Sequence, residues 1–422
     1  MTESHIGDLA AFIAASPSSF HAAEESARRL EAAGFHRLDE TAAWPTDAGR
    51  RFVVRDGAVI GWVQPDGAAG EIPFRIVGTH TDSPGFKLKP KPTTGAHGWL
   101  QAGVEVYGGP LLNSWLDREL ELAGRLVTTT GEQHLVRTGP FLRFPQLAIH
   151  LDRGVNDGLR LDPQQHMNPV FGLGDVLTAD LVGHLAGLAG IRGDDVAGYD
   201  ISVADTAAPA VFGRDGAFFA SGRMDNLVSV HSGLLALLAT PETGEHVSVF
   251  AAFDHEEVGS ATRSGAAGPF LADVLARISD GLGAGESDRL RALAGSWCFS
   301  ADAGHSVHPN YPDRHDPVNR PVMGRGPLLK INAKQRYATD ATGAAEWARS
   351  CAQAGVAWQE FVSNNAVPCG STIGPLTATR LGIRTVDIGI PLLSMHSARE
   401  LASVDDPGAL AAALGAFLAP VA

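Results

Sequence analysis

Strand-like and helical segments alternate along both ends of this chain, and this alternation limits the folds that it can adopt. Apolar runs typical of strands lie at residues 74–77, 247–253, 297–301, 328–331, 356–361 and 385–390. Helical periodicity lies at 7–33, 227–238, 270–278 and 407–417, and a hairpin pattern lies at 51–63. Strands connected through helices usually pair in parallel. The pattern therefore predicts an α/β fold with a mainly parallel or mixed central sheet flanked by helices.

The middle of the chain has a different pattern, with little helical periodicity before Gly174. Strand-like segments at 100–107, 115–129, 134–137 and 144–152 are separated by turn residues. We interpret residues 90–222 as a second, mostly β domain that is inserted into the first. The first domain is then discontinuous and consists of residues 1–89 and 223–422. A chain of 422 residues is long enough for two domains.

Charge and composition make several classes of partner improbable. The formal net charge of −14 disfavours binding to nucleic acid or to an anionic membrane. Cys298, Cys351 and Cys369 form no CxxC motif, which fits a reducing compartment. The first ten residues lack the pattern of a signal peptide, and no apolar run is as long as a membrane span. We therefore expect a soluble cytoplasmic protein.

Two adjacent carboxylates follow the apolar run 247–253. Glu256 and Glu257 lie in the stretch Asp254-His-Glu256-Glu257-Val-Gly259. Side chains of neighbouring residues on an extended segment point in opposite directions. One carboxylate could therefore bind a metal while the other moves a proton, as in metal-assisted hydrolysis. The alternative is a solvated acidic turn.

Five potential metal ligands lie at predicted strand ends or in loops beside them. They are His80, Asp225, Glu257, Asp302 and His396. In an open α/β sheet, functional groups gather beyond the carboxyl ends of the strands. Two imidazoles and three carboxylates suit zinc, or manganese or cobalt. Five ligands exceed what one catalytic zinc needs, so they suggest two ions that share a bridging carboxylate.

Each of these residues also has an ordinary structural explanation. His80 or His396 could be structural, Asp225 could cap the following helix, and Asp302 could end a strand in solvent. Asp82 could be a simple cap, but a carboxylate so close to a ligating histidine often orients its ring. Two further histidines, His305 and His308, could be additional ligands. Spacing alone therefore supports only the hypothesis of a dinuclear site.

Seven short motifs, taken in order, carry more information than any one of these residues. They are His80-Thr-Asp82-Ser-Pro84, Gly222-Arg-Met-Asp225-Asn226, Asp254-His-Glu256-Glu257-Val-Gly259, Ser300-Ala-Asp302-Ala-Gly-His305-Ser-Val-His308-Pro-Asn-Tyr311, Lys330-Ile-Asn-Ala-Lys-Gln-Arg336-Tyr, Cys369-Gly-Ser-Thr-Ile-Gly-Pro375 and Ser394-Met-His396-Ser-Ala-Arg-Glu400. With these motifs the chain resembles the M18 metallopeptidases, the aspartyl aminopeptidases, along nearly its whole length. The resemblance implies a zinc-exopeptidase fold and a hydrolase that removes N-terminal Asp or Glu from peptides.

The resemblance also implies roles for the site residues. His80 and Asp302 would bind one Zn²⁺, Glu257 and His396 would bind a second, and Asp225 would bridge the two ions. Mn²⁺ or Co²⁺ could replace zinc. Glu256 would be the general base that activates water, and Asp82 would orient His80.

Two further residues are implied to contact the substrate. Lys330 would pair with the acidic side chain, unless it is a strand-end lysine in solvent; Lys334 and Arg336 are weaker candidates. His150, in the inserted domain, would reach the active site of a neighbouring subunit and contact the substrate. An alternative scheme makes His150 a metal ligand.

The family assembles into a tetrahedral dodecamer built from dimers, with its active sites inside, so the resemblance implies the same homo-oligomer here. The inserted domain would supply the dimer contacts. Three alternatives remain at this stage: an aminopeptidase of broader or neutral specificity, a deacylase of amino-acid derivatives, and a non-catalytic assembly component with the same fold.

Overall fold

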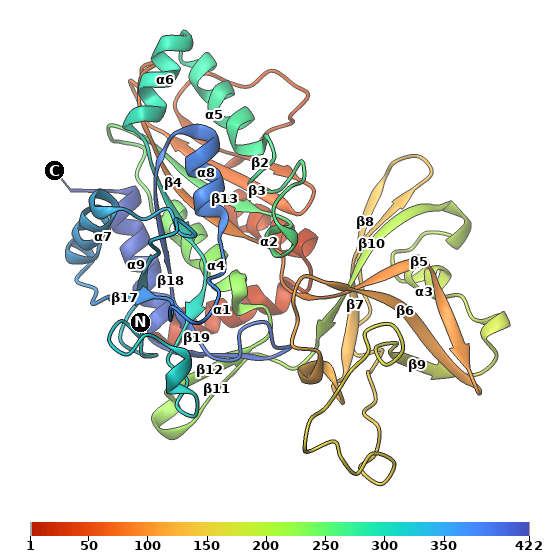
Figure 1. Cartoon of the computed structure of the whole chain (residues 1–422). Coiled ribbons are helices and arrows are strands. Elements are labelled where there is room, and N and C mark those ends of the chain that lie inside the picture. The colour runs from red at the N-terminus through yellow and green to blue at the C-terminus, as the bar shows by residue number, and fades with distance from the viewer. Residues whose placement is uncertain (1, 422) are drawn as a thin grey trace.

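A nine-stranded sheet forms the centre of the larger of two lobes in the computed structural model, which describes residues 2–421 (Figure 1). In spatial order its strands are β1 (His36–Arg37), β2 (Gly49–Arg55), β3 (Ala58–Gln64), β13 (Val247–Phe253), β4 (Phe74–His80), β14 (Trp297–Ala301), β18 (Arg384–Gly389), β16 (Leu328–Ile331) and β17 (Gln359–Val362). The central strands β13, β4, β14 and β18 pair in parallel, and β3 and β16 join them antiparallel. The predicted α/β class with a mainly parallel, mixed sheet is confirmed.

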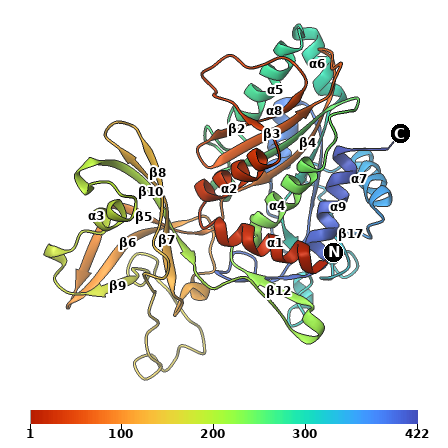
Figure 2. The same cartoon turned by 180° about the vertical axis from the view of Figure 1, so that it is seen from behind.

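Helices cover both faces of this sheet (Figures 1 and 2). One face packs against α1 (Thr2–Ala15), α2 (Ser19–Ala32), α4 (Met224–Leu238), α7 (Ala341–Ala354) and α9 (Asp406–Leu418). The other face packs against α5 (Phe270–Gly281), α6 (Glu286–Gly295) and α8 (Ile373–Leu381). Strand β13 is buried on both faces, which explains why its sequence is a continuous apolar run. Phe250 and Ala252 enter the first core, while Val249 and Ala251 enter the second.

The smaller lobe contains a six-stranded antiparallel sheet with its own apolar core. In spatial order its strands are β8 (Gln133–Arg137), β7 (Leu120–Thr128), β10 (Val196–Asp205), β5 (Gly85–Ala96), β6 (Trp99–Tyr107) and β9 (Val170–Leu173), and α3 (Leu181–Leu188) packs on the sheet. The predicted mostly β region is therefore present, while the division into 1–89 with 223–422 and 90–222 stays a prediction. The chain returns to the larger lobe through the hairpin of β11 (Ala210–Phe212) and β12 (Phe218–Ser221), and β12 pairs with β20 (Glu400–Ser403).

Of the strands predicted in the smaller lobe, one begins later than expected and another does not form. The segment 115–129 begins as a 3₁₀ turn, η1 (Leu112–Trp115), and becomes strand only at β7. Trp115 is buried with its ring edge-on to Phe86, and Asp117 has a left-handed φ of 59°, so the chain turns before the strand begins. The segment 144–152 forms no named strand beyond an isolated bridge at Phe144, and its apolar side chains Leu147 and Leu151 are exposed.

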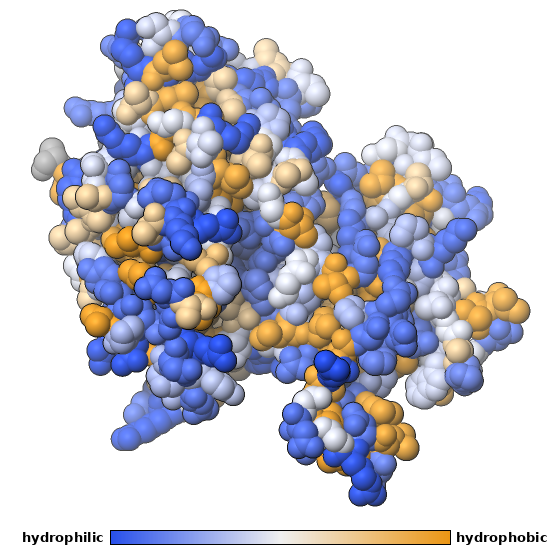
Figure 3. Space-filling view, in the orientation of Figure 1, coloured by the Kyte–Doolittle hydropathy of each residue, from blue (hydrophilic) through white to orange (hydrophobic). Residues whose placement is uncertain are grey.

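The surface is hollowed where the two lobes meet (Figure 3). The loop between β8 and β9 extends from the smaller lobe away from this hollow (Figure 1). Over residues 2–421, every helix is too short or too polar to cross a membrane.

Trp347 offers a test of the packing between α7 and the sheet. Its side chain is 0% exposed and meets the ring of Phe299 at a centroid distance of 5.7 Å. We expect Trp347→Ala to lower the free energy of unfolding by about 3–5 kcal/mol, because it removes a large buried side chain and leaves a cavity. Trp99 is 49% exposed, so Trp99→Ala is a matched control that should lower the free energy of unfolding by much less. Equal losses in urea denaturation would contradict this account of the core.

Candidate metal centre

The edge of the large sheet brings together side chains from three neighbouring strands. His80 is the last residue of β4, and it stands opposite Phe253 in the parallel register with β13. The 3₁₀ turn η5 (Glu256–Val258) follows β13 and carries Glu256 and Glu257, and Asp302 follows directly on β14. Because parallel strands end at the same edge of a sheet, residues far apart in the sequence meet there.

Asp225 lies between two histidines at this edge. Its Oδ1 is 3.5 Å from Nε2 of His80, and its Oδ2 is 3.4 Å from Nε2 of His396. The side chain is 4% exposed, and Oδ1 accepts no hydrogen bond from any described residue. Leaving a buried carboxylate oxygen without a partner is costly, so its environment suits a cation between each oxygen and its histidine.

Two further histidine–carboxylate distances at the site are similarly long. Nε2 of His80 is 3.9 Å from Oδ1 of Asp302, and Nε2 of His396 is 3.6 Å from Oε2 of Glu257. These distances are too long for good hydrogen bonds. Two atoms that each bind one tetrahedral zinc at about 2.0–2.1 Å lie about 3.4 Å apart. The donor set therefore fits the zinc ions that the sequence predicts.

Three groups of residues could each hold an ion, since the ligand atoms within each group lie within 4.8 Å of one another. They are His80 with Asp225 and Asp302, His80 with Glu256 and Glu257, and Asp225 with Glu257 and His396. All five predicted ligands and the predicted base Glu256 thus lie together. Their assignment as ligands and base stays a prediction.

The backbone around the site orients both imidazoles. Nδ1 of His80 lies 3.1 Å from the carbonyl oxygen of Asp82, and Nδ1 of His396 lies 3.0 Å from that of Gly109. A carbonyl oxygen can only accept, so Nδ1 is the donor in each of these contacts and Nε2 is the nitrogen left to face a metal.

Asp82 contacts more residues of the site than His80, the one that the sequence predicts. Its carboxylate accepts hydrogen bonds from the backbone N–H groups of Glu256 at 3.0 Å and Glu257 at 3.1 Å. It also accepts one from the hydroxyl of Tyr107 at 2.8 Å, and its Oδ1 lies 3.4 Å from Nδ1 of His80. Burial disfavours the charged carboxylate, but His80 and these hydrogen bonds outweigh burial and lower the pKa of Asp82.

Several carboxyl groups lie close together at this edge. Burial raises the pKa of Glu256 to about 7; the charge of His80 opposes this rise, and the neighbouring carboxylates reinforce it. Burial opposes the charged form of His396, but the Asp225 carboxylate raises its pKa to about 10. A bound divalent cation would stabilise the carboxylates that burial otherwise disfavours.

Sequence reasoning missed several residues that support the site. The buried carboxylate of Glu400 accepts hydrogen bonds from the backbone N–H groups of Asp225 at 3.0 Å and His396 at 2.9 Å. Its position four residues after His396 was a usable signal. Tyr107 and Gly109 had no such signal, because their role depends on how the smaller lobe approaches the sheet.

Lys330 is not a solvated strand-end lysine, so that alternative is wrong. Its side chain is 2% exposed, its Nζ donates a hydrogen bond to the carbonyl of Ala303 at 2.8 Å, and it lies 3.8 Å from Oδ1 of Asp302. The same Nζ lies 5.4 Å from the ring centroid of Tyr337. The weaker candidates, Lys334 and Arg336, are exposed.

A cavity of about 280 Å³ lies among the residues that follow Asp302 and those that precede His396. Its lining includes Tyr337, Met395, His305 and His308. The two histidines therefore face the cavity and belong to none of the three candidate metal groups.

His150 is not brought to these groups by the fold of one chain. It lies exposed in the loop between β8 and β9, outside the three candidate metal groups of residues 2–421. Its predicted role in a neighbouring subunit stays a prediction.

Comparison with known proteins shows the family of this chain. The family model "Aminopeptidase I zinc metalloprotease (M18)" matches residues 12–418. The chain is 53% identical over 422 residues to "Probable M18 family aminopeptidase 2" of Streptomyces coelicolor, covering 99% of this chain and 98% of that protein. A protein of the same name from Mycobacterium tuberculosis is 44% identical over 421 residues, covering 97% of each chain.

Solved structures share the fold. A chain in the cryo-electron-microscopy structure of the Ape4 and Nbr1 complex superposes with a TM-score of 0.95 at 34% identity, covering 99% of this chain and 86% of that one. The S. cerevisiae mApe1 dodecamer superposes with a TM-score of 0.85 at 26% identity, covering 98% of this chain and 96% of that one. From the family match, the close relatives and the shared fold, we conclude that this chain belongs to the M18 family of zinc aminopeptidases, which are metallo-exopeptidases.

Proposed function

We propose that this enzyme removes N-terminal Asp or Glu from peptides with a dinuclear zinc centre. The placement of Asp225, with one oxygen toward His80 and the other toward His396, carries this proposal. Asp302 would complete the site of one ion and Glu257 that of the other, with Mn²⁺ or Co²⁺ as alternatives to zinc. When bound, the two ions would supply Lewis acidity for attack on the peptide carbonyl.

Glu256 is our proposed general base. Its carboxylate belongs to a candidate group with His80 and Glu257, and its backbone N–H is fixed by Asp82. A carboxylate can take a proton from water that bound ions would make more acidic, and the resulting carboxylic acid can return it. Glu256 would take a proton from the attacking water and pass it to the amine that leaves.

Lys330 is our proposed selector for acidic side chains. An ammonium group has three N–H donors, and the described residues give Lys330 one hydrogen-bond acceptor, the carbonyl of Ala303. Its burial beside Asp302 would make a substrate carboxylate a strong partner. A small neutral side chain on the substrate would leave the ammonium without this partner.

We also propose a tetrahedral dodecamer in the cytoplasm. The dodecameric state of the S. cerevisiae relative supports the assembly, and three free cysteines support a reducing compartment. His150 would contact substrate bound to a neighbouring subunit, which its exposed position in the smaller lobe would allow.

Glu256→Gln tests the base. The amide keeps the size of the side chain and cannot accept the proton, so we expect turnover to fall about 10²–10⁴-fold while both zinc ions stay bound. Glu257→Gln is the comparison, because it alters a proposed ligand and should lower zinc content. Elemental analysis and turnover of an Asp-containing dipeptide measure both effects. Near-normal turnover by Glu256→Gln would reject the assignment.

Lys330→Met tests the selector, because methionine keeps most of the apolar stem and removes the charge. We expect the ratio of kcat/KM for Asp- over Leu-dipeptides to fall about 30-fold or more. Lys334→Met removes a nearby exposed charge and should leave this ratio unchanged. A wild-type preference for Leu or Lys substrates would favour a neutral or broad specificity and reject acidic selection.

A further inference from the structure

A short segment of the smaller lobe, Tyr107–Leu111, begins at the last residue of β6 and enters the metal centre. We call this segment the strap. We propose that the strap is a positioning element that organises the ion site formed by Glu257 and His396, so that the smaller lobe completes the metal centre of its own chain. This inference rests on the dinuclear centre proposed above.

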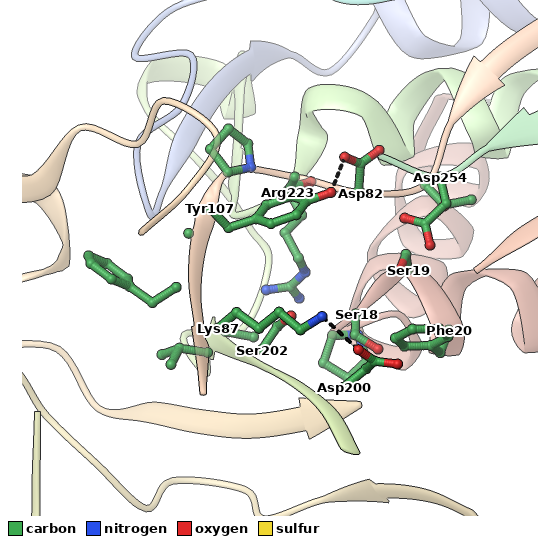
Figure 4. A pocket seen from close by; sticks show the side chains of 18 of the residues that line it. Ser18, Ser19, Phe20, Asp82, Lys87, Tyr107, Asp200, Ser202, Arg223 and Asp254 are labelled. Atoms are coloured by element: carbon green, nitrogen blue, oxygen red, sulfur yellow. Dashed lines mark hydrogen bonds and ion pairs between the residues drawn. The ribbon is translucent and has the colours of Figure 1, made fainter. Parts of the chain in front are cut away.

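The first contact of the strap acts through Asp82. The hydroxyl of Tyr107 donates to Oδ2 of Asp82 at 2.8 Å (Figure 4). The same Oδ2 accepts the backbone N–H of Glu257, while Oδ1 accepts that of Glu256. Tyr107 therefore fixes the carboxylate that holds the proposed base and a proposed ligand in place.

The second contact holds His396 from two directions. The carbonyl of Gly109 accepts from Nδ1 of the imidazole at 3.0 Å, and the backbone N–H of Leu111 donates to the carbonyl of His396 at 2.9 Å. The first bond fixes the orientation of the ring, and the second fixes the backbone that carries it.

The third contact is a close approach to Glu257. Gly108 has a left-handed φ of 66°, and a Cβ atom there would lie 3.1 Å from Cβ and 3.2 Å from the carbonyl oxygen of Glu257. The backbone of the strap thus packs directly against this residue, and only glycine fits without a shift.

Tyr107 acts through Asp82, which contacts residues of both proposed ion sites, but the other contacts of the strap fall on one of them. Gly108 meets Glu257, and Gly109 and Leu111 meet His396, whereas the structure gives these three residues no hydrogen bond to His80 or Asp302. A disturbed strap should therefore weaken one ion more than the other.

Gly108→Ala tests this asymmetry against Gly139→Ala. Gly139 has a nearly identical φ of 67°, but no atom lies within 4 Å of an added Cβ. Gly139→Ala therefore introduces the same backbone strain without a close contact to a neighbouring residue. Zn²⁺ would be titrated calorimetrically into chelator-stripped protein. We expect Gly108→Ala to bind one ion as the wild type does and the second about 10- to 100-fold more weakly, and Gly139→Ala to bind both normally. Equal binding by the two variants would overturn the inference.

Tyr107→Phe is tested against Tyr199→Phe in the same lobe. The hydroxyl of Tyr199 donates to the carbonyl of Lys89 at 2.7 Å, so its loss removes one comparable hydrogen bond elsewhere in the sheet. We expect only Tyr107→Phe to alter the visible absorption of the Co²⁺-loaded protein and to lower kcat about 10-fold or more with KM nearly unchanged. Matching melting temperatures of the stripped proteins would verify folding.

The outcomes separate this inference from the proposed function. If the wild type bound two zinc ions and cleaved peptides while both strap variants behaved like their controls, only the inference would fail. If the stripped wild-type protein bound no zinc, the dinuclear centre and the inference would fail together.

Discussion

The carboxylate of Asp225, buried between the imidazoles of His80 and His396, is the contact on which the rest of the structure depends. An acidic group with an unpaired oxygen in the interior is unfavourable unless positive charge lies beside it. The surrounding residues make this arrangement rigid. The single carboxylate of Glu400 accepts hydrogen bonds from the backbone N–H groups of both Asp225 and His396. These two residues therefore cannot move apart without the loss of a buried hydrogen bond.

The large sheet supplies the precision that such a site requires. Strands β13, β4 and β14 are parallel neighbours with helices on both faces, so their ends are fixed by two apolar cores as well as by hydrogen bonds. The smaller lobe adds the strap from outside this sheet. The metal centre is thus built from a rigid edge and from a segment whose position depends on how the two lobes meet.

Much of this organisation could be predicted from the sequence. Apolar periodicity indicates the central strands, and because parallel strands end at one edge, it also predicts that His80, Glu257 and Asp302 lie together. Contacts that depend on tertiary approach could not be found this way. Tyr107 ends a strand of another sheet, and the burial of Lys330 follows from the packing of Ala303 and Tyr337 around it. The start of β7 was misplaced because Trp115 is apolar like a strand residue but packs within a turn.

The alternating burial of β13 constrains how this chain can change over evolutionary time. Its consecutive side chains serve opposite layers, so a deletion of one residue would exchange the two sets and shorten the strand by about 3.3 Å. The carboxylates that follow would then retreat from the histidines while the apolar layers lost their fit. Drift within this strand is therefore confined to replacements that preserve both length and volume.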